Sequence, residues 1–309
     1  MRSSVRYPCS KSHQVPNAAA AVLSPTGVGG EDGDMSDRVT CVIDGGVADV
    51  RMNRAEKMNA IDGAMFSALV EVGEALKTDS SVRAVVLSGE GRSFCAGLDF
   101  GSFQAMAGGR GGNVLPQDGD PDDPSRLPGR ITHAGQQAVW AWQEVPVPVI
   151  AAVHGAALGG GCQIALGADI RYVSHDVQKS ILEIRWGLIP DMAGTQLLRE
   201  LVGLDKAKEL TFTGRMVGAE EAVRIGLATR IAEDPWALAL ETAQEIAGRS
   251  PHAIRAGKRL LNNAAQVTTA DGLAAERREI RALIGSPNQV EAVTAWFEKR
   301  PANYTDPSA

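Results

Sequence analysis

Residues 154–172 read HGAALGGGCQIALGADIRY, and three consecutive glycines stand there between a predicted strand and a predicted helix. Glycine lets a backbone approach a ligand closely, and the first amides of a helix have no partner within the helix. The stretch therefore predicts a site that binds an oxyanion. Tight packing of a helix on a strand is one alternative explanation of the glycines. A dinucleotide-binding loop is disfavoured, because the GxGxxG spacing is missing.

A second glycine-containing turn, GRSFCAGLD at 91–99, follows the predicted strand VRAVVLSG at 82–89. Two such turns, each after a parallel strand, can direct one N–H each at a shared point. An oxyanion hole for a thioester enolate requires this arrangement.

Working outward from these turns, apolar runs and helical periodicity alternate along the chain. The pattern predicts an α/β fold with a parallel-type sheet covered by helices. The first elements are a hairpin at 39–52 centred on Gly45 and Gly46 and a helix at 62–79 capped by Asp62. The remaining predicted elements are strands at 82–89, 147–155 and 168–174 and helices at 130–144 and 160–167.

Three regions follow from this pattern. We expect a disordered extension at 1–35, an α/β core at 36–195 and a helical C-terminal subdomain at 196–309, with no strand after about residue 195. The Gly-, Pro- and Asp-rich segment at 108–130 is typical of a long mobile loop, which we expect to shape a substrate pocket.

The composition excludes several classes of function. The 309 residues carry a formal charge of −6, which gives no basic field for nucleic acid. No apolar stretch is long enough to span a membrane. The four cysteines show no metal-ligand spacing, so we expect no metal and a reducing, cytoplasmic location.

The motifs SFCAGLD, HGAALGGGCQIALGADIRY and LEIRWGLIPDMAGTQLL occur in that order. Together they resemble the crotonase family, the enoyl-coenzyme A hydratases and isomerases. The resemblance implies a ββα spiral core with a helical C-terminal region, assembled as a trimer or a dimer of trimers. It also implies an acyl-CoA substrate that brings coenzyme A with it, and no permanently bound cofactor.

The same resemblance assigns roles to residues of the two turns. The oxyanion-hole amides would be those of Leu98 and Gly160. Ala96 stands where the family contacts the adenine of coenzyme A.

Four further residues match coenzyme-binding positions of the family. Arg54 and Lys57 in NRAEKMNAI are candidates for the coenzyme phosphates, and Trp296 and Lys299 in WFEKRPANY match a last helix that often serves a neighbouring subunit. Each also has a simpler explanation: surface cations, a core tryptophan, or a lysine that complements the helix dipole.

The candidate acid and base groups decide between reactions. Hydration by the family's usual route uses two glutamates, and the first of these places holds Gln163 while the second holds Glu183. Glutamine can position a water or the substrate but cannot exchange a proton. Glu183 lies in a predicted apolar strand, where burial raises the pKa of a carboxyl group and suits a general base, unless Arg185 pairs with it.

Asp191 lies eight residues after Glu183, a spacing that resembles the acid pair of dienoyl-CoA isomerases. It follows Pro190, so it is also a candidate helix N-cap. We predict an enoyl- or dienoyl-CoA double-bond isomerase with Glu183 and Asp191 as acid and base. The alternatives are an enoyl-CoA hydratase and an acyl-CoA binding protein without catalytic activity.

Overall fold

The computed structural model describes residues 21–22, 38–102 and 130–308. The predicted loop at 108–130, except for its last residue, and nearly all of the predicted extension lie outside these ranges. The strands are β1 (Ala21–Val22), β2 (Val39–Asp44), β3 (Val47–Met52), β4 (Ala84–Gly89), β5 (Val149–Val153), β6 (Ala156–Leu158), β7 (Ile170–Val173), β8 (Gln178–Ser180) and β9 (Arg230–Ile231). The α-helices are α1 (Gly63–Thr78), α3 (Ala134–Glu144), α4 (Gly160–Leu166), α5 (Gly194–Val202), α6 (Leu204–Thr213), α7 (Ala219–Arg224), α8 (Pro235–Ala247), α9 (Pro251–Asn263), α10 (Thr269–Leu283) and α11 (Pro287–Glu298), and the 3₁₀ helices are η2 (Ala55–Lys57) and η3 (Glu183–Trp186).

The main sheet has the strand order β1-β2-β3-β4-β5-β7-β9. It is parallel from β3 to β9, and β1, β2 and β3 pair antiparallel. The predicted hairpin is confirmed, and its two glycines have positive φ values of 56° and 82°. A small second sheet pairs β6 with β8 and carries the chain into the glycine-rich turn.

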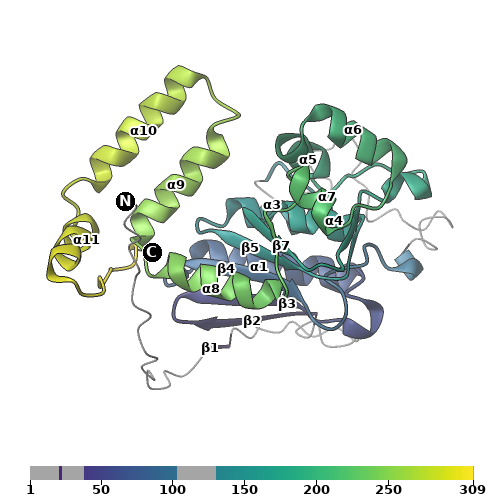
Figure 1. Cartoon of the computed structure of the whole chain (residues 1–309), viewed down its shortest axis with the longest axis horizontal. Helices are drawn as coiled ribbons and strands as arrows, with labels where there is room; N and C mark the ends of the chain where they lie inside the picture. Colours follow the sequence, from purple (N-terminus) through teal and green to yellow (C-terminus); the bar gives the residue numbers. More distant parts are fainter. Residues whose placement is uncertain (1–20, 23–37, 103–129, 309) are drawn as a thin grey trace, which may run out of the picture.

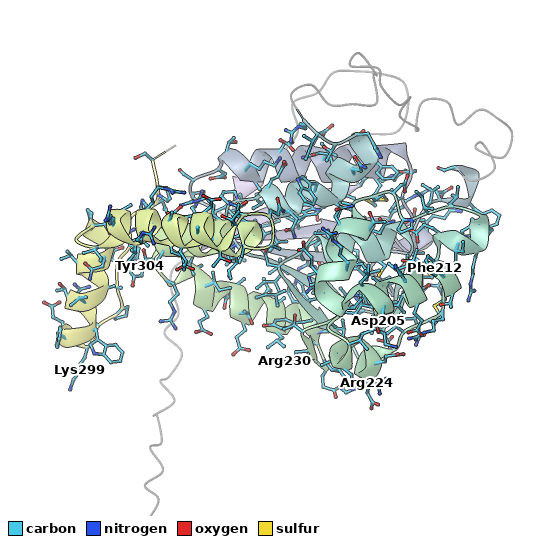
Figure 2. The ribbon with its side chains drawn as sticks, turned by 90° about the horizontal axis from the view of Figure 1, so that it is seen from above. Asp205, Phe212, Arg224, Arg230, Lys299 and Tyr304 are labelled. Atoms are coloured by element: carbon cyan, nitrogen blue, oxygen red, sulfur yellow. The ribbon has the colours of Figure 1, made fainter. Side chains whose placement is uncertain are left out.

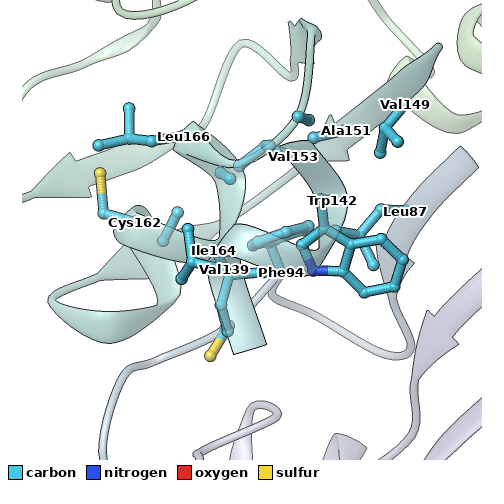
Figure 3. Packing of buried hydrophobic residues seen from close by; sticks show 14 of the residues in the cluster. Leu87, Phe94, Val139, Trp142, Val149, Ala151, Val153, Cys162, Ile164 and Leu166 are labelled. Atoms are coloured by element: carbon cyan, nitrogen blue, oxygen red, sulfur yellow. The ribbon is translucent and has the colours of Figure 1, made fainter. Parts of the chain in front are cut away.

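Helices cover the two faces of the main sheet (Figure 1). The β4 strand is buried on both faces, so its residues alternate between two apolar clusters. Ala84 and Val86 pack with α8 on one face, whereas Val85 and Leu87 belong to the cluster that includes α1 and α3. Figure 3 shows the second cluster, in which Trp142 of α3 lies near strand residues of β4 and β5.

The C-terminal region contains one element that the sequence did not predict. The β9 strand pairs with β7, so the prediction that strands end near residue 195 is wrong for this two-residue strand. It was missed because so short a strand has no measurable periodicity. The helices α9, α10 and α11 extend away from the sheet (Figure 1). No helix in the described ranges is long and apolar enough to cross a bilayer.

Candidate active site

Backbone hydrogen bonds join the two glycine-containing turns. The amide of Cys95 donates to the Ala156 carbonyl at 2.9 Å, and the amide of Leu158 donates to the Cys95 carbonyl at 3.0 Å. A Cβ atom on Gly161 would lie 2.3 Å from the Cys95 carbonyl oxygen, and one on Gly97 would lie 2.6 Å from that of Leu158. The glycines therefore allow two backbones to meet where side chains would hold them apart.

The amides of Leu98 and Gly160 have no hydrogen-bond acceptor within the described residues. The amide of Ile61 donates to the Gly97 carbonyl and that of Asp99 donates to the Ile61 carbonyl. Because successive peptide groups of an extended chain face opposite sides, the Leu98 amide points away from Ile61. Gly160 is the first residue of α4, where helical amides have no partner within the helix. Both amides are free to receive a ligand oxygen.

Glu183 lies beside the glycine-rich turn, but not in a strand as predicted. It begins the 3₁₀ helix η3, because β8 ends at Ser180 and the chain turns at Leu182 and again at Gly187, which has a φ of 71°. A Cβ atom on Gly159 would lie 3.4 Å from Glu183 Oε1. The carboxyl group therefore lies next to the residue that precedes the Gly160 amide.

The Glu183 carboxyl group is held in an environment that suits a base. Its Oε2 atom is buried and has no hydrogen-bond partner. Burial raises the pKa of Glu183 above its usual range; its own backbone amide and the Gln163 side chain oppose this shift, and the Asp191 charge adds to it. Arg185 is exposed and forms no ion pair with Glu183, so the alternative of a structural pair does not apply.

Gln163 is completely buried and connects three parts of the site. Its Nε2 atom donates to Glu183 Oε1 at 2.6 Å. Its Oε1 atom accepts from the amides of Met192 and Gly194 at 2.9 and 3.0 Å. This geometry directs the side chain at Glu183 and at the start of α5.

Asp191 lies in an exposed turn before α5. The alternative that it caps this helix is wrong, because α5 begins at Gly194 and its N-cap is Ala193, with a φ of 63°. The Gly194 amide already has a partner in Gln163, so Asp191 is not needed for capping. Its negative charge adds a minor contribution to the raised pKa of Glu183, so the two carboxylates lie within electrostatic range of each other.

The first coenzyme-binding candidates differ in their surroundings. Arg54 is largely buried, since its side chain is 13% exposed, and its guanidinium pairs with Asp99 at 2.7 Å and donates to the Ala60 carbonyl at 3.0 Å. Lys57 is exposed. The amide of Ala96 donates to the Met58 carbonyl, which brings the loop containing Lys57 against the turn that carries Leu98.

Trp296 and Lys299 are not near the other site residues of their own chain. Trp296 is 80% exposed on α11, and Lys299 ends that helix with a φ of 56°. Figure 2 shows Lys299 at the opposite end of the molecule from Phe212 of α6. The end of α6 is the part that meets η3, because a Cβ atom on Gly214 would lie 2.9 Å from Ile184. Within one chain these two residues therefore lie far from Glu183.

Sequence reasoning missed two residues that shape the site. Asp99 pairs with Arg54. An acidic residue directly after Leu98 and a cation in the 53–61 loop were a usable signal for this pair. Met192 packs on the glycine-rich turn, since a Cβ atom on Gly160 would lie 3.0 Å from its Sδ atom. Nothing in the sequence pointed to this contact.

Comparison with known proteins shows which family the chain belongs to. The profile of the family described as enoyl-CoA hydratase/isomerase matches residues 42–115 and 126–307. A short-chain-enoyl-CoA hydratase of Clostridium acetobutylicum is 34% identical over 83% of this chain and 93% of its own. The mitochondrial methylglutaconyl-CoA hydratase of Homo sapiens is 30% identical over 84% of this chain and 74% of its own.

Solved structures of related proteins have the same fold as this chain. The crystal structure of an enoyl-CoA hydratase from Bacillus anthracis superposes with a TM-score of 0.76 at 28% identity, covering 86% of this chain and 98% of that one. A structure of Pseudomonas aeruginosa DspI superposes with a TM-score of 0.75 at 30% identity, covering 89% and 99%. The matched profile, the relatives and the fold agree: the chain belongs to the crotonase family of enoyl-CoA hydratases and isomerases.

Proposed function

We propose that this protein is an enoyl- or dienoyl-CoA double-bond isomerase in which Glu183 moves a proton between two carbon atoms. The observation that carries the proposal is the buried Glu183 carboxyl group, with Oε1 held by Gln163 and Oε2 unpartnered. The unpartnered oxygen has no hydrogen bond to lose when it takes up a substrate proton, and the raised pKa keeps the group suited to both taking and returning that proton.

The chemistry begins at the thioester oxygen, which accepts hydrogen bonds from the amides of Leu98 and Gly160. Glu183 takes a proton from the α carbon of a 3-enoyl thioester, and the C–H electron pair enters a dienolate. Each oxyanion donor lowers the barrier by about 2.7 to 4 kcal/mol. Glu183 then returns the proton to the γ carbon, so the double bond moves with no net change of atoms. For a 3,5-dienoyl thioester, Asp191 is the proposed second group, at the exposed end of the conjugated chain.

The side-chain chemistry and hydrogen bonds of Gln163 support isomerisation over hydration. Addition of water by two carboxylates needs a proton-exchanging group at this position, and an amide has none. Positioning a water instead would need a free face of the side chain. Gln163 is completely buried and its polar atoms already bond Glu183, Met192 and Gly194.

Hydration is the second candidate function. It is favoured by the names of the relatives, which are mostly hydratases and include the Clostridium acetobutylicum enzyme. In that case a single carboxylate, Glu183, would activate the water. A binding protein without catalysis is less well supported, because such a protein does not need an unpartnered carboxyl group beside the oxyanion amides.

The coenzyme part of the substrate would lie along the loop that contains Lys57 and the turn that contains Ala96. Lys57 is the better candidate for a phosphate contact, because Arg54 already pairs with Asp99. Trp296 and Lys299 would reach the coenzyme of a neighbouring subunit in a trimer or a dimer of trimers. Their exposure at the far end of the chain supports this assignment.

The test is an assay of the purified protein with a 2-enoyl, a 3-enoyl and a 3,5-dienoyl thioester. Loss of the conjugated thioester absorbance reports hydration, and its appearance or shift reports migration of the double bond. We expect migration to dominate, to fall at least 100-fold in Glu183→Gln, and to fall for the dienoyl substrate in Asp191→Asn.

Fast hydration of the 2-enoyl thioester that is lost in Glu183→Gln but kept in Asp191→Asn would overturn the isomerase proposal in favour of the hydratase. If Glu183→Gln leaves turnover of all three substrates unchanged, the enzyme mechanism itself fails.

A further inference from the structure

Three hydrogen bonds meet at the Gln163 side chain, and their chemistry fixes its orientation. The amides of Met192 and Gly194 are donors, so the atom that faces them must be the amide oxygen. The NH₂ group is thereby turned toward Glu183 Oε1, at 2.6 Å. The assignment of oxygen and nitrogen follows from the backbone alone, and a flipped amide would leave two donors facing a donor.

The surroundings keep the side chain in this place. Gln163 has no exposed surface, and a Cβ atom on Gly194 would lie 2.5 Å from its Oε1 atom. Glycine at 194 is therefore required for the start of α5 to approach the amide. Gln163 acts as a cap for α5 from a distant part of the chain, which explains why no side chain near Ala193 does so.

We propose that Gln163 is the positioning residue for the acid/base chemistry: it orients Glu183 with Oε2 toward the substrate and ties that orientation to the 191–194 turn. Its side chain has no exposed surface, so the proposed role is to hold Glu183 in place. The inference rests on the proposed role of Glu183, but it holds for isomerisation and hydration alike.

The hydrogen bond also affects when Glu183 is ionised. A donor to a carboxylate favours the charged form, and Gln163 is one of the groups that lower the pKa of Glu183 against the larger effect of burial. Removing the donor therefore raises the pKa of Glu183 further. The base form is then lost at a higher pH, and the acid limb of the pH–rate profile moves upward.

Two variants separate these effects. Gln163→Met fills a similar volume and removes all three hydrogen bonds. Gln163→Glu keeps an acceptor for Met192 and Gly194, and it donates to Glu183 only while the carboxylate pair holds a proton. Gln143→Glu is the matched control, since Gln143 on α3 donates to the Gly167 carbonyl and takes no part in the site.

The experiment measures kcat and KM from about pH 5 to 9 with whichever thioester the wild type converts. We expect Gln163→Met to lower kcat at least tenfold with little change in KM, and to move the acid limb of the pH–rate profile to higher pH. We expect Gln163→Glu to keep the thermal stability and much of the activity near neutral pH. It should gain an alkaline loss of activity, where both carboxylates become ionised and repel each other.

The inference is overturned if the pH–rate profiles of both Gln163 variants coincide with those of wild type and Gln143→Glu. If Gln163→Met does not fold, the profile of Gln163→Glu alone decides. This result differs from a failure of the proposed function. In that case Glu183→Gln, measured in parallel, would itself retain full turnover.

Discussion

At the scale of single residues, the candidate site contains a buried polar group that does not stabilise the fold. A buried carboxyl oxygen without a partner, as in Glu183, destabilises the folded state, because its ionised form loses hydration that nothing replaces. Active sites commonly retain such groups at the expense of stability. The apolar run around Glu183 predicted that burial raises the pKa of its carboxyl group, and the structure agrees; its role as a base stays a proposal.

The loss of stability caused by the ionised Glu183 carboxyl group can be measured. The folded-state pKa of Glu183 is raised, so its protonated form is favoured by folding, and the stability it contributes at low pH is lost as pH rises through that raised value. We expect Glu183→Gln to exceed wild type in melting temperature by about 2 °C or more near pH 8. The gap should close toward about pH 4. Scanning calorimetry across this range checks it, and a constant gap at all pH values would contradict it.

A second buried charge gives an independent pH dependence. Lys179 on β8 has no exposed surface, its Nζ atom donates to the Leu227 carbonyl at 2.9 Å, and no ion pair among the described residues includes it. Burial lowers the pKa of Lys179 to about 8. Between that value and the higher pKa of the unfolded chain, the unfolded state binds more protons, so stability rises with pH.

We therefore expect the free energy of unfolding of wild type to increase from about pH 8 to 10, and Lys179→Met to remove most of that increase. Urea titrations at several pH values measure both. Equal slopes in the two proteins would show that Lys179 keeps its proton in the folded state.

At the scale of elements, the sequence predicted most helices and strands around the site, because their signals are local. The Asp62 cap of α1 and the hairpin glycines have fixed chemistry at fixed positions. The apolar run around Glu183 predicts a strand, but Glu183 begins a 3₁₀ helix that ends at Gly187, where φ is 71°. The role of Gln163 in starting α5 was not accessible, since its partners lie about 30 residues away in the chain.

The glycine-rich turn makes a prediction about close packing. Gly161→Ala places a Cβ atom 2.3 Å from a backbone oxygen of Cys95, which cannot rotate away. We expect a loss of about 1 to 3 kcal/mol in stability and a fall in kcat of at least 100-fold, since the Gly160 amide must shift. Gly63→Ala is the control, because nothing lies within 4 Å of its Cβ position in the first turn of α1. Urea unfolding and kcat measure the pair, and similar results for both variants would count against the packing argument.

At the scale of the whole molecule, apolar side chains are buried in the α/β core but partly exposed on the C-terminal helices. The core around β4 and β5 is buried, whereas the C-terminal helices expose large apolar side chains. Trp296 and Phe297 on α11 are about four-fifths exposed. Such surfaces usually mark contacts with another protein. Sequence periodicity predicted these helices, but their distance from the site became evident only from the arrangement in Figures 1 and 2.

If Lys299 serves the site of a neighbouring subunit, two defective variants should repair each other. Lys299→Ala subunits keep Glu183, and Glu183→Gln subunits keep Lys299, so a mixed oligomer contains sites with both residues intact. We expect each variant alone to turn over little substrate at low acyl-CoA concentration, because one lacks the base and the other binds the coenzyme weakly. After the two are mixed, dissociated and reassembled, activity should rise severalfold above the mean of the separate proteins, with a KM near that of wild type. Mixing without dissociation is the control. If Lys299 acted within its own chain, no mixed site would be complete, and activity would stay at that mean.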